Sequence, residues 1–341
     1  MIRARFRPWG NLTSIISGLG SRDWSFIGCV SMEDRCTIVR STLSESQTVI
    51  NSMIFRVRDA DSRYTQEIEA ITESNQSELL GTGVSQGEIK RIDLLGKHGE
   101  IGSYIQDFLE NHATENLIID ISSLPKKIFF LLIRKALEDR PNIQNILVTY
   151  AEPESYCSSQ LAENPEGWKP LPGFLGPRVE PSQKALIIGL GFEPLGLPEL
   201  YSSGLFNNTN IRLLFPFPAS PKNVSRNWDF ARLLEPLPGN ASSEIDRVDS
   251  LNIPDVFDKL LSITGNGEIY SILAPFGPKP MSLAMCLFAS ACARLSCPPS
   301  VYYTQPTIYN PHYSQGVKYA DNIPAIHAYC VKLNGSNLYT L

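Results

Sequence analysis

Two stretches of this chain share one pattern: an apolar strand, then Pro-Lys, then an apolar helix. They are LIIDISSLPKKIFFLLIRKAL (117–137) and SILAPFGPKPMSLAMCLFAS (271–290), and their Pro-Lys pairs lie 153 residues apart. Under this shift eight residues between positions 119 and 156 are identical to their counterparts, whereas composition alone would give roughly two. The identical pairs are Ile119/Ile272, Pro125/Pro278, Lys126/Lys279, Ala136/Ala289, Val148/Val301, Tyr150/Tyr303, Pro153/Pro306 and Tyr156/Tyr309. The chain is therefore expected to contain an internal duplication.

The correspondence continues upstream, where each copy has three further strand-like segments separated by segments of helical period. These segments are 26–34, 48–57 and 89–95 in the first copy, and 186–194, 210–218 and 245–251 in the second. Regular alternation of strands and helices is typical of an α/β fold with a parallel sheet covered on both faces. Two copies are too few for a solenoid. We therefore expect two tandem Rossmann-like lobes related by a pseudo-twofold axis, with the carboxyl ends of both sheets facing one shared cleft.

The repeat also sets the expected domain boundaries. Residues 1–156 form the first lobe and residues 184–341 the second. Residues 157–183 between them carry five prolines. They also hold large apolar residues, which are unusual in a free linker, so an ordered connection is expected. The end of the second lobe, 325–341, alternates around Asn334-Gly335 and predicts a β-hairpin.

Composition excludes several classes of protein. With 43% hydrophobic and 19% charged residues among 341, the chain is that of a folded globular protein. Its formal charge of −5 argues against a protein that coats nucleic acid. The densest apolar run, 128–133, is too short to span a bilayer, so no membrane association is expected. Seven scattered cysteines without Cys-x-x-Cys spacing indicate reduced thiols in a cytoplasmic protein.

The sequence predicts neither a bound metal nor a cofactor. Its four histidines show no metal-ligand spacing. The glycine-rich stretch GLGFEPLG (189–196) lacks the spacing of a dinucleotide fingerprint, and neither a Walker A sequence nor a Gly-x-Ser-x-Gly elbow occurs. Asp120 ends a strand of the first copy, but its counterpart is Leu273, so it would act in one lobe only.

The two Pro-Lys pairs are the main candidates for a ligand site. Ligands of open parallel sheets gather beyond the carboxyl ends of the strands, where both pairs are expected. Proline suits the first helical position, and the N–H groups and dipole of a helix start favour an anion. Lys126 and Lys279 would add full positive charges there. The alternative is that each is an ordinary exposed lysine at a helix start. A lysine at the same place in both copies makes this alternative weaker.

Carboxylates and tyrosines are predicted at the same ends of the sheets. Glu33 and Glu193 follow the first strand of each copy, where they would contact a ribose or base, act as a general base, or stabilise a helix start. Each copy also contains Tyr-x-x-Pro-x-x-Tyr, which begins at Tyr150 and Tyr303 and ends at Tyr156 and Tyr309. These rings would either stack on bases or pack the connection between the lobes.

The stretch FGPKPMSLAMCLFA (276–289) resembles the Gly-Gly-Thr-Lys-Pro-Met signature of the CARF family. The matching residues are Gly277, Lys279, Pro280 and Met281, and SSLPKK (122–127), which includes Ser123, is a weaker version. CARF domains are Rossmann-like sensors of cyclic oligonucleotides in prokaryotic antiviral defence. Two such units in one chain also resemble the SAVED arrangement.

This resemblance implies a protein that binds a cyclic oligonucleotide second messenger and passes the signal to a separate effector. Lys126 and Lys279 would then neutralise phosphates, with Ser123 and Gly277 beside them. Two alternatives stay open. The protein could be a ring nuclease that cleaves the signal, with Glu33 and Glu193 as candidate catalytic residues, or a non-catalytic subunit of a defence complex. Binding without catalysis is the preferred interpretation.

Overall fold

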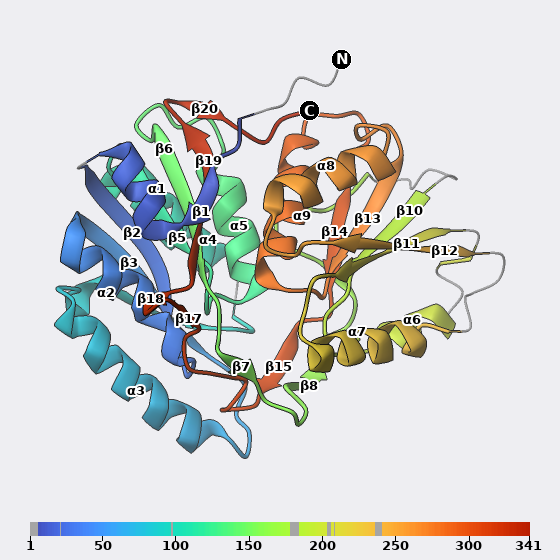
Figure 1. Ribbon diagram of the computed structural model, residues 1–341, viewed down its shortest axis with the longest axis horizontal. Coiled ribbons are helices and arrows are strands. Elements are labelled where there is room, and N and C mark those ends of the chain that lie inside the picture. The colour runs from blue at the N-terminus through green and yellow to red at the C-terminus, as the bar shows by residue number, and fades with distance from the viewer. Residues whose placement is uncertain are drawn as a thin grey trace. The chain divides into compact units, whose positions relative to one another are not determined.

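The computed structural model describes residues 6–20, 22–96, 98–177, 184–202, 206–207, 209–235 and 241–341 (Figure 1). Its contacts divide the chain into two compact units. Unit 1 comprises Met1–Glu163 and Thr307–Leu338, and unit 2 comprises Asn164–Pro306 and Tyr339–Leu341. The first unit boundary, after Glu163, lies close to the predicted end of the first lobe at residue 156. The C-terminal residues Thr307–Leu338, however, belong to unit 1 and not to the second unit.

Unit 1 is built on a sheet with the strand order β1-β19-β6-β5-β2-β3-β4, and β20 pairs with β19. Strands β6, β5, β2, β3 and β4 are parallel to one another, and β19 runs antiparallel to β6 and to β1. The strands are β1 (Trp9–Asn11), β2 (Asp23–Val30), β3 (Thr48–Arg58), β4 (Ile89–Asp93), β5 (Asn116–Asp120), β6 (Asn145–Ala151), β19 (Ile326–Leu333) and β20 (Ser336–Asn337). Strands β5 and β6 are buried along their whole length, as expected where helices cover both faces of a parallel sheet.

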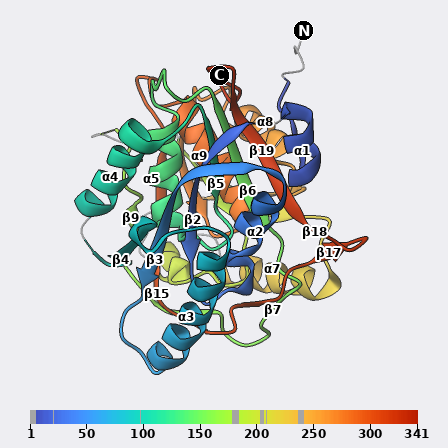
Figure 2. The ribbon, with the colours of Figure 1, turned by 90° about the vertical axis from the view of Figure 1, so that its left-hand side faces the viewer.

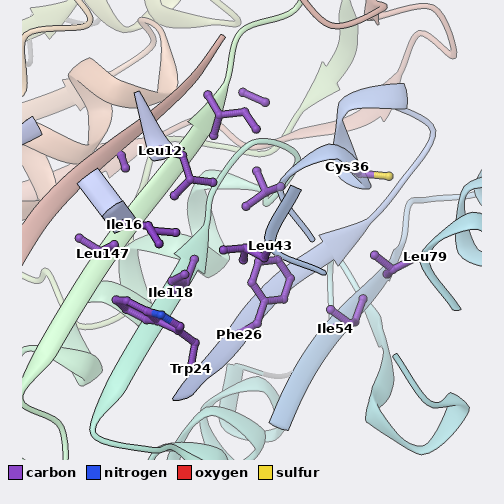
Figure 3. Packing of buried hydrophobic residues seen from close by; sticks show 14 of the residues in the cluster. Leu12, Ile16, Trp24, Phe26, Cys36, Leu43, Ile54, Leu79, Ile118 and Leu147 are labelled. Carbon is purple, nitrogen blue, oxygen red and sulfur yellow. The ribbon is translucent and has the colours of Figure 1, made fainter. Parts of the chain in front are cut away.

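Helices cover both faces of this sheet, with α1 and α2 on one side and α4 and α5 on the other (Figure 2). The helices are α1 (Leu12–Leu19), α2 (Ile38–Ser46), α3 (Thr65–Gly81), α4 (His98–Asp107) and α5 (Lys126–Ala136). Short helical turns are η1 (Asp34–Cys36), η2 (Gln86–Glu88) and η3 (Phe108–His112). On the α1–α2 face, Leu12, Leu43 and Leu79 pack on Phe26 and Ile54 of the strands (Figure 3). Burial of this apolar cluster is the main force that holds the layers together.

Unit 2 contains a second sheet with the order β12-β11-β10-β13-β14-β9. Its first five strands are parallel and β9 is antiparallel. Helices α8 and α9 lie on one side of it and α6 and α7 on the other (Figure 1). The elements are β9 (Lys169–Pro170), β10 (Lys184–Gly189), α6 (Leu197–Ser202), β11 (Asn210–Pro216), α7 (Pro221–Leu233), β12 (Ser242–Val248), α8 (Ile253–Ile263), β13 (Tyr270–Pro275), α9 (Lys279–Ala291) and β14 (Ser300–Tyr303).

The five parallel strands have the same spatial order in both sheets. If the parallel strands of each unit are counted from one to five along the chain, starting at β2 in unit 1 and at β10 in unit 2, their spatial order is 3-2-1-4-5 in both sheets. This is the order of a Rossmann-like sheet. The fold is therefore mixed α/β and Rossmann-like, as predicted. Because many unrelated proteins share this order, the common origin of the two halves stays a prediction.

The C-terminal segment corrects the predicted boundary of the second lobe. Strand β19 was expected to belong to the second lobe, residues 184–341. It pairs instead with β6 of unit 1, where Tyr329 lies opposite Val148. Strand β20 folds back on β19, with Asn334 and Gly335 at positive φ between them. A segment late in the chain thus completes the first sheet.

The predicted connection is ordered as far as it is described. Strand β9 pairs with β14, and Leu171 and Phe174 are buried, while Trp168 stacks on Tyr302 at 5.3 Å between ring centroids. Residues 178–183 of this segment lie outside the described part of the chain.

Short strands lie in the remaining segments, where β7 pairs with β16 and β17 with β18. Their bounds, with those of β8 and β15, are β7 (Ser155–Tyr156), β8 (Ala162–Pro165), β15 (Pro306–Tyr309), β16 (Ser314–Gln315), β17 (Tyr319–Ala320) and β18 (Ile323–Pro324). Among the described residues, every helix is too short or too polar to cross a lipid bilayer.

Candidate functional site

The first parallel strand of each unit lies between the second and the fourth parallel strand. This is the point in an open α/β sheet where the strand order reverses direction. In unit 1, β2 lies between β3 and β5, and in unit 2, β10 lies between β11 and β13. The turns that follow these strands form the place where such sheets bind ligands. We refer to the turns after β2, β3 and β5 as the first rim, and those after β10, β11 and β13 as the second rim.

The Pro-Lys pairs occupy equivalent positions on the two rims. Lys126 is the first residue of α5 and Lys279 the first of α9, and each is half-buried. Their N-cap prolines have nearly the same backbone angles, φ −57° and ψ 144° at Pro125 and φ −53° and ψ 152° at Pro278. The prolines, expected at the first helical position, are the N-cap residues, so each helix starts one residue later than predicted.

The helices of this protein differ in whether a side chain caps their first turn. The side chains of Asn11, Ser220 and Asn252 accept a hydrogen bond from the first turns of α1, α7 and α8. A proline has no acceptor in its side chain, and accordingly neither α5 nor α9 has a side-chain cap; α2 and α3 also lack one. Helix starts in general favour an anion, because their first N–H groups have no partner within the helix.

Ser123 and Gly277 hold the turns after the fourth strands against the first strands. The Ser123 hydroxyl donates to the backbone oxygen of Cys29, on β2, at 2.9 Å. At Gly277 a Cβ atom would lie 2.9 Å from the Met281 sulfur, 3.0 Å from the backbone oxygen of Leu190 and 3.3 Å from the carbonyl carbon of Gly189, so a larger residue would require these neighbours to shift. Both residues thus hold the turn after the fourth strand close to the first strand.

Glu33 is buried and interacts with other protein groups. Its Oε2 accepts from Nε and Nη2 of Arg35, at 3.0 and 2.6 Å, and from the Ser314 hydroxyl at 2.6 Å. The side chains of Arg35 and Glu33 are only 2% and 7% exposed. Arg35 also donates to the backbone oxygen of Ala151, at the end of β6. Glu33 therefore ties together the turn after β2, the end of β6 and the segment around Ser314.

The electrostatics of this cluster keep Arg35 charged. Burial acts to lower the pKa of Arg35, but attraction by Glu33 and by the hydroxyls of Tyr150 and Tyr156 outweighs it, so the pKa is raised well above its usual value. Burial and the neighbouring Tyr150 raise the pKa of Tyr156. Tyr156 therefore stays neutral beside the Arg35–Glu33 ion pair.

Glu193 lies in a different environment, although the predicted repeat pairs it with Glu33. Its carboxylate lies 3.9 Å from the guanidinium of Arg226, on α7, and the side chains of Glu193 and Arg226 are 20% and 17% exposed. The Arg226 guanidinium also lies over the ring of Phe192, 4.2 Å from its centroid. Next to it, Asn227 donates to the backbone oxygen of Gly191 at 2.7 Å. Helix α7 thus supports the turn after β10 from one side.

The tyrosines pack within the protein. Tyr150 is 3% exposed and its hydroxyl lies 3.2 Å from that of Tyr156. Tyr303 is 8% exposed, and its ring lies 5.3 Å from that of Phe276. Tyr309 contacts Tyr313 in unit 1. This placement favours the packing interpretation over base stacking.

Sequence analysis missed one residue on the first rim, Asp59, which directly follows β3. Burial raises the pKa of its half-buried carboxyl to about 7. An acidic residue directly after the second strand could have pointed to it, because Rossmann-like sheets bind ribose hydroxyls there.

Asp120 has a local role at the end of β5. Its Oδ1 accepts from the backbone N–H and hydroxyl of Ser122, at 3.0 and 2.5 Å, and from Thr149 at 3.3 Å. Within the described ranges, no group of three or more His, Cys, Asp or Glu residues could hold a metal ion.

Comparison with known proteins adds little. No protein-family model matches the chain, and no curated protein does. Solved structures give 17 matching chains, among them a mutant of MtNAS in complex with S-adenosylmethionine. That match has 15% sequence identity and a TM-score of 0.23, and it covers 40% of this chain and 44% of that chain. Similarity at this level carries no argument about function.

Proposed function

We propose that this protein binds a phosphorylated nucleotide, a cyclic oligonucleotide signal of prokaryotic antiviral defence, and passes the signal to a separate effector protein in the cytoplasm. Each rim, taken by itself, binds phosphate: the first at the start of α5 through Lys126, and the second at the start of α9 through Lys279. The observation that carries this proposal is the equivalence of the two Pro-Lys turns, each directly after the fourth strand of a Rossmann-like sheet.

Charge supports this assignment. A lysine at the first position of a helix opposes the helix dipole and destabilises the isolated helix slightly. Lys126 and Lys279 both occupy this unfavourable position, each after an N-cap proline without a side-chain acceptor. An anion at the same place interacts favourably with the lysine and with the helix start. The resemblance to the CARF family supplies the class of anion.

The buried cluster assigns Glu33 a structural part in this proposal. Its carboxylate oxygen already accepts three hydrogen bonds from Arg35 and Ser314. Glu193, whose side chain keeps 20% of its surface, is the better candidate for a contact with sugar or base.

Calorimetric titration of the purified protein with cyclic tri-, tetra- and hexa-adenylate tests the proposal. We expect one of them to bind, and Lys126→Ala and Lys279→Ala each to weaken binding about tenfold or more, because each removes a charge-assisted hydrogen bond. Lys222→Ala is the matched control, since Lys222 lies in the first turn of α7, which has a Ser220 cap.

Chromatography of the reaction mixtures separates the remaining alternatives. Intact ligand after incubation is the expected result for a sensor. Cleavage products would make the protein a phosphodiesterase, and Glu193→Gln would then show whether that residue takes part. Binding that both lysine variants leave unchanged, or no binding of any nucleotide, would refute the assigned role of the rims.

A further inference from the structure

Strand β12 forms one edge of the second sheet, and its backbone has a partner on one side only (Figure 1). Within the described part of the chain it pairs with β11 and with no other strand. It is seven residues long, and all but Asp246 and Val248 are exposed. The other edge strands described in the two large sheets, β1, β4 and β9, have only three, five and two residues. The free N–H and C=O groups of a long edge strand are a template for another strand.

One face of β12 forms a groove with α7 that is largely apolar. Ser243 and Ile245 line this groove from the strand, and Trp228, Leu234 and Glu235 line it from α7 and the two residues after it. Ile245 is 44% exposed and Trp228 is 38% exposed. Large apolar side chains beside a free sheet edge favour a contact that removes them from water.

The opposite face of β12 carries carboxylates that this protein already neutralises. Arg212 on β11 contacts Glu244 at 2.7 Å and Asp246 at 2.6 Å, and Lys259 of α8 lies 3.3 Å from Asp246. Charged side chains on an edge strand normally discourage pairing between two edges. Because cations of the same unit lie beside both carboxylates, this face does not prevent such pairing.

The groove face has an acid at one end of the strand and a base at the other. Glu235 lies beside the start of β12 and follows the C-terminal end of α7, where an acid is unfavourable by itself. Arg247 lies near the end of β12, on the same face as Ile245. Among the residues that the structure describes, neither Glu235 nor Arg247 forms an ion pair, whereas Arg232 on the same groove pairs with Asp229 at 3.2 Å.

We propose that two copies of this chain associate through β12, which pairs antiparallel with the β12 of the second copy and joins the two second sheets into one. A twofold axis perpendicular to the sheet keeps both α7 faces on the same side. With Ile245 on this axis, the register places Arg247 of each copy opposite Ser243 of the other, beside Glu235. The two groups that lack an ion pair in one copy thus find each other across the axis.

A second copy fits this edge because one contact satisfies three kinds of group at once. The free backbone groups of β12 gain hydrogen bonds, Ile245 packs against its counterpart, and the opposite charges of Glu235 and Arg247 come together. This inference goes beyond the proposed function, because it needs no ligand and involves neither rim.

Sedimentation velocity of the full-length protein, measured over a wide range of concentrations, tests the proposal. We expect monomers at low concentration and dimers at high concentration. Ile245→Lys places unpaired positive charges on the axis and should raise the dissociation constant of the dimer about tenfold or more. Ile269→Lys is the matched control, because Ile269 is 42% exposed in the same unit but lies outside β12, and it should leave the constant unchanged.

An exchange of charges tests the register. Glu235→Arg and Arg247→Glu should each weaken the dimer, because each brings like charges together across the axis. The double variant Glu235→Arg/Arg247→Glu restores opposite charges and should restore association. If the double variant is no stronger a dimer than either single variant, the contact between Glu235 and Arg247 is wrong.

Two further results would overturn the inference. Monomers at every concentration would exclude a second copy from this edge, and a strand of another protein would be its remaining occupant. A dimer that Ile245→Lys and Arg247→Glu both leave intact would use another surface. Circular dichroism of each variant shows whether it is folded, and Ile245→Ser replaces Ile245→Lys if the lysine variant is not.

Discussion

At the scale of single residues, two glutamates that the sequence pairs in a predicted repeat have different physical roles. Glu33 lies in a nearly dry cluster with Arg35 and Ser314, whereas Glu193 lies at a partly exposed surface beside Arg226. A buried charge that loses its partner is costly, because water cannot replace that partner. An exposed pair contributes little, because water screens it.

The two glutamate-to-glutamine variants should therefore differ in stability. Glu33→Gln leaves Arg35 buried without a counter-charge, and we expect it to lower the free energy of unfolding by about 3 kcal/mol. Glu193→Gln should lower it by less than about 1 kcal/mol. Urea denaturation of both variants measures the difference, and equal losses would contradict the structural role of Glu33.

Asp59 predicts a dependence of stability on pH. In the unfolded chain its carboxyl loses its proton near the usual pKa of 3.8, but in the folded protein only near pH 7. Between these values the folded state binds more protons, so this group lowers the free energy of unfolding as pH rises. From pH 5 to pH 8, wild-type protein should lose on the order of 2 kcal/mol more than Asp59→Asn.

Thermal unfolding at several pH values measures this loss. Asp61→Asn is the control, because the Asp61 side chain is 76% exposed. Parallel curves for wild-type protein and Asp59→Asn would show that Asp59 titrates normally.

At the scale of elements, the turns after β10 and β13 approach each other at their backbones. A Cβ atom on Gly191 would lie 2.2 Å from the backbone oxygen of Phe276. Leu190, just before it, donates to the oxygen of Leu214 on β11, which prevents the turn from moving away easily. Strand and helix boundaries here follow from local sequence, but the need for glycine comes from the neighbouring turn.

Gly191→Ala should therefore destabilise unit 2. We expect a loss of about 2 kcal/mol or more, because the new methyl group meets backbone atoms that cannot rotate away. Gly167→Ala, in the same unit, has no atom within 4 Å of its new Cβ and should change stability by less than about 1 kcal/mol. Denaturation curves compare the two, and equal behaviour would show that the turns can separate.

At the scale of the whole molecule, β19 is central to unit 1 although it lies near the end of the chain. It pairs with β1 on one edge and with β6 on the other. Tyr329 on this strand is fully buried and stacks on Trp9, with ring centroids 5.9 Å apart. Unit 1 therefore completes its sheet only after residues 164–306 have been made.

Tyr329→Ala should loosen unit 1 and not unit 2. Loss of a large buried ring costs about 3–4 kcal/mol, and hydrogen exchange should accelerate first in β6 and β2. Val301→Ala, a buried change in β14, should accelerate exchange first in β13 and β10. Faster exchange of β10 and β13 in Tyr329→Ala would contradict the assignment of β19 to unit 1.

Local sequence alone determined the alternation of strands and helices, and it placed the starts of α5 and α9 within one residue of Lys126 and Lys279, because hydrophobic period and proline act within a few residues. Tertiary structure decided the rest. The pairing of β19 with β6, the Arg35–Glu33–Ser314 cluster and the burial of the Asp59 carboxyl all depend on residues far apart in the chain. Burial and strand pairing depend on the segments that pack around a residue in the folded protein. No local sequence pattern shows which distant segments these are.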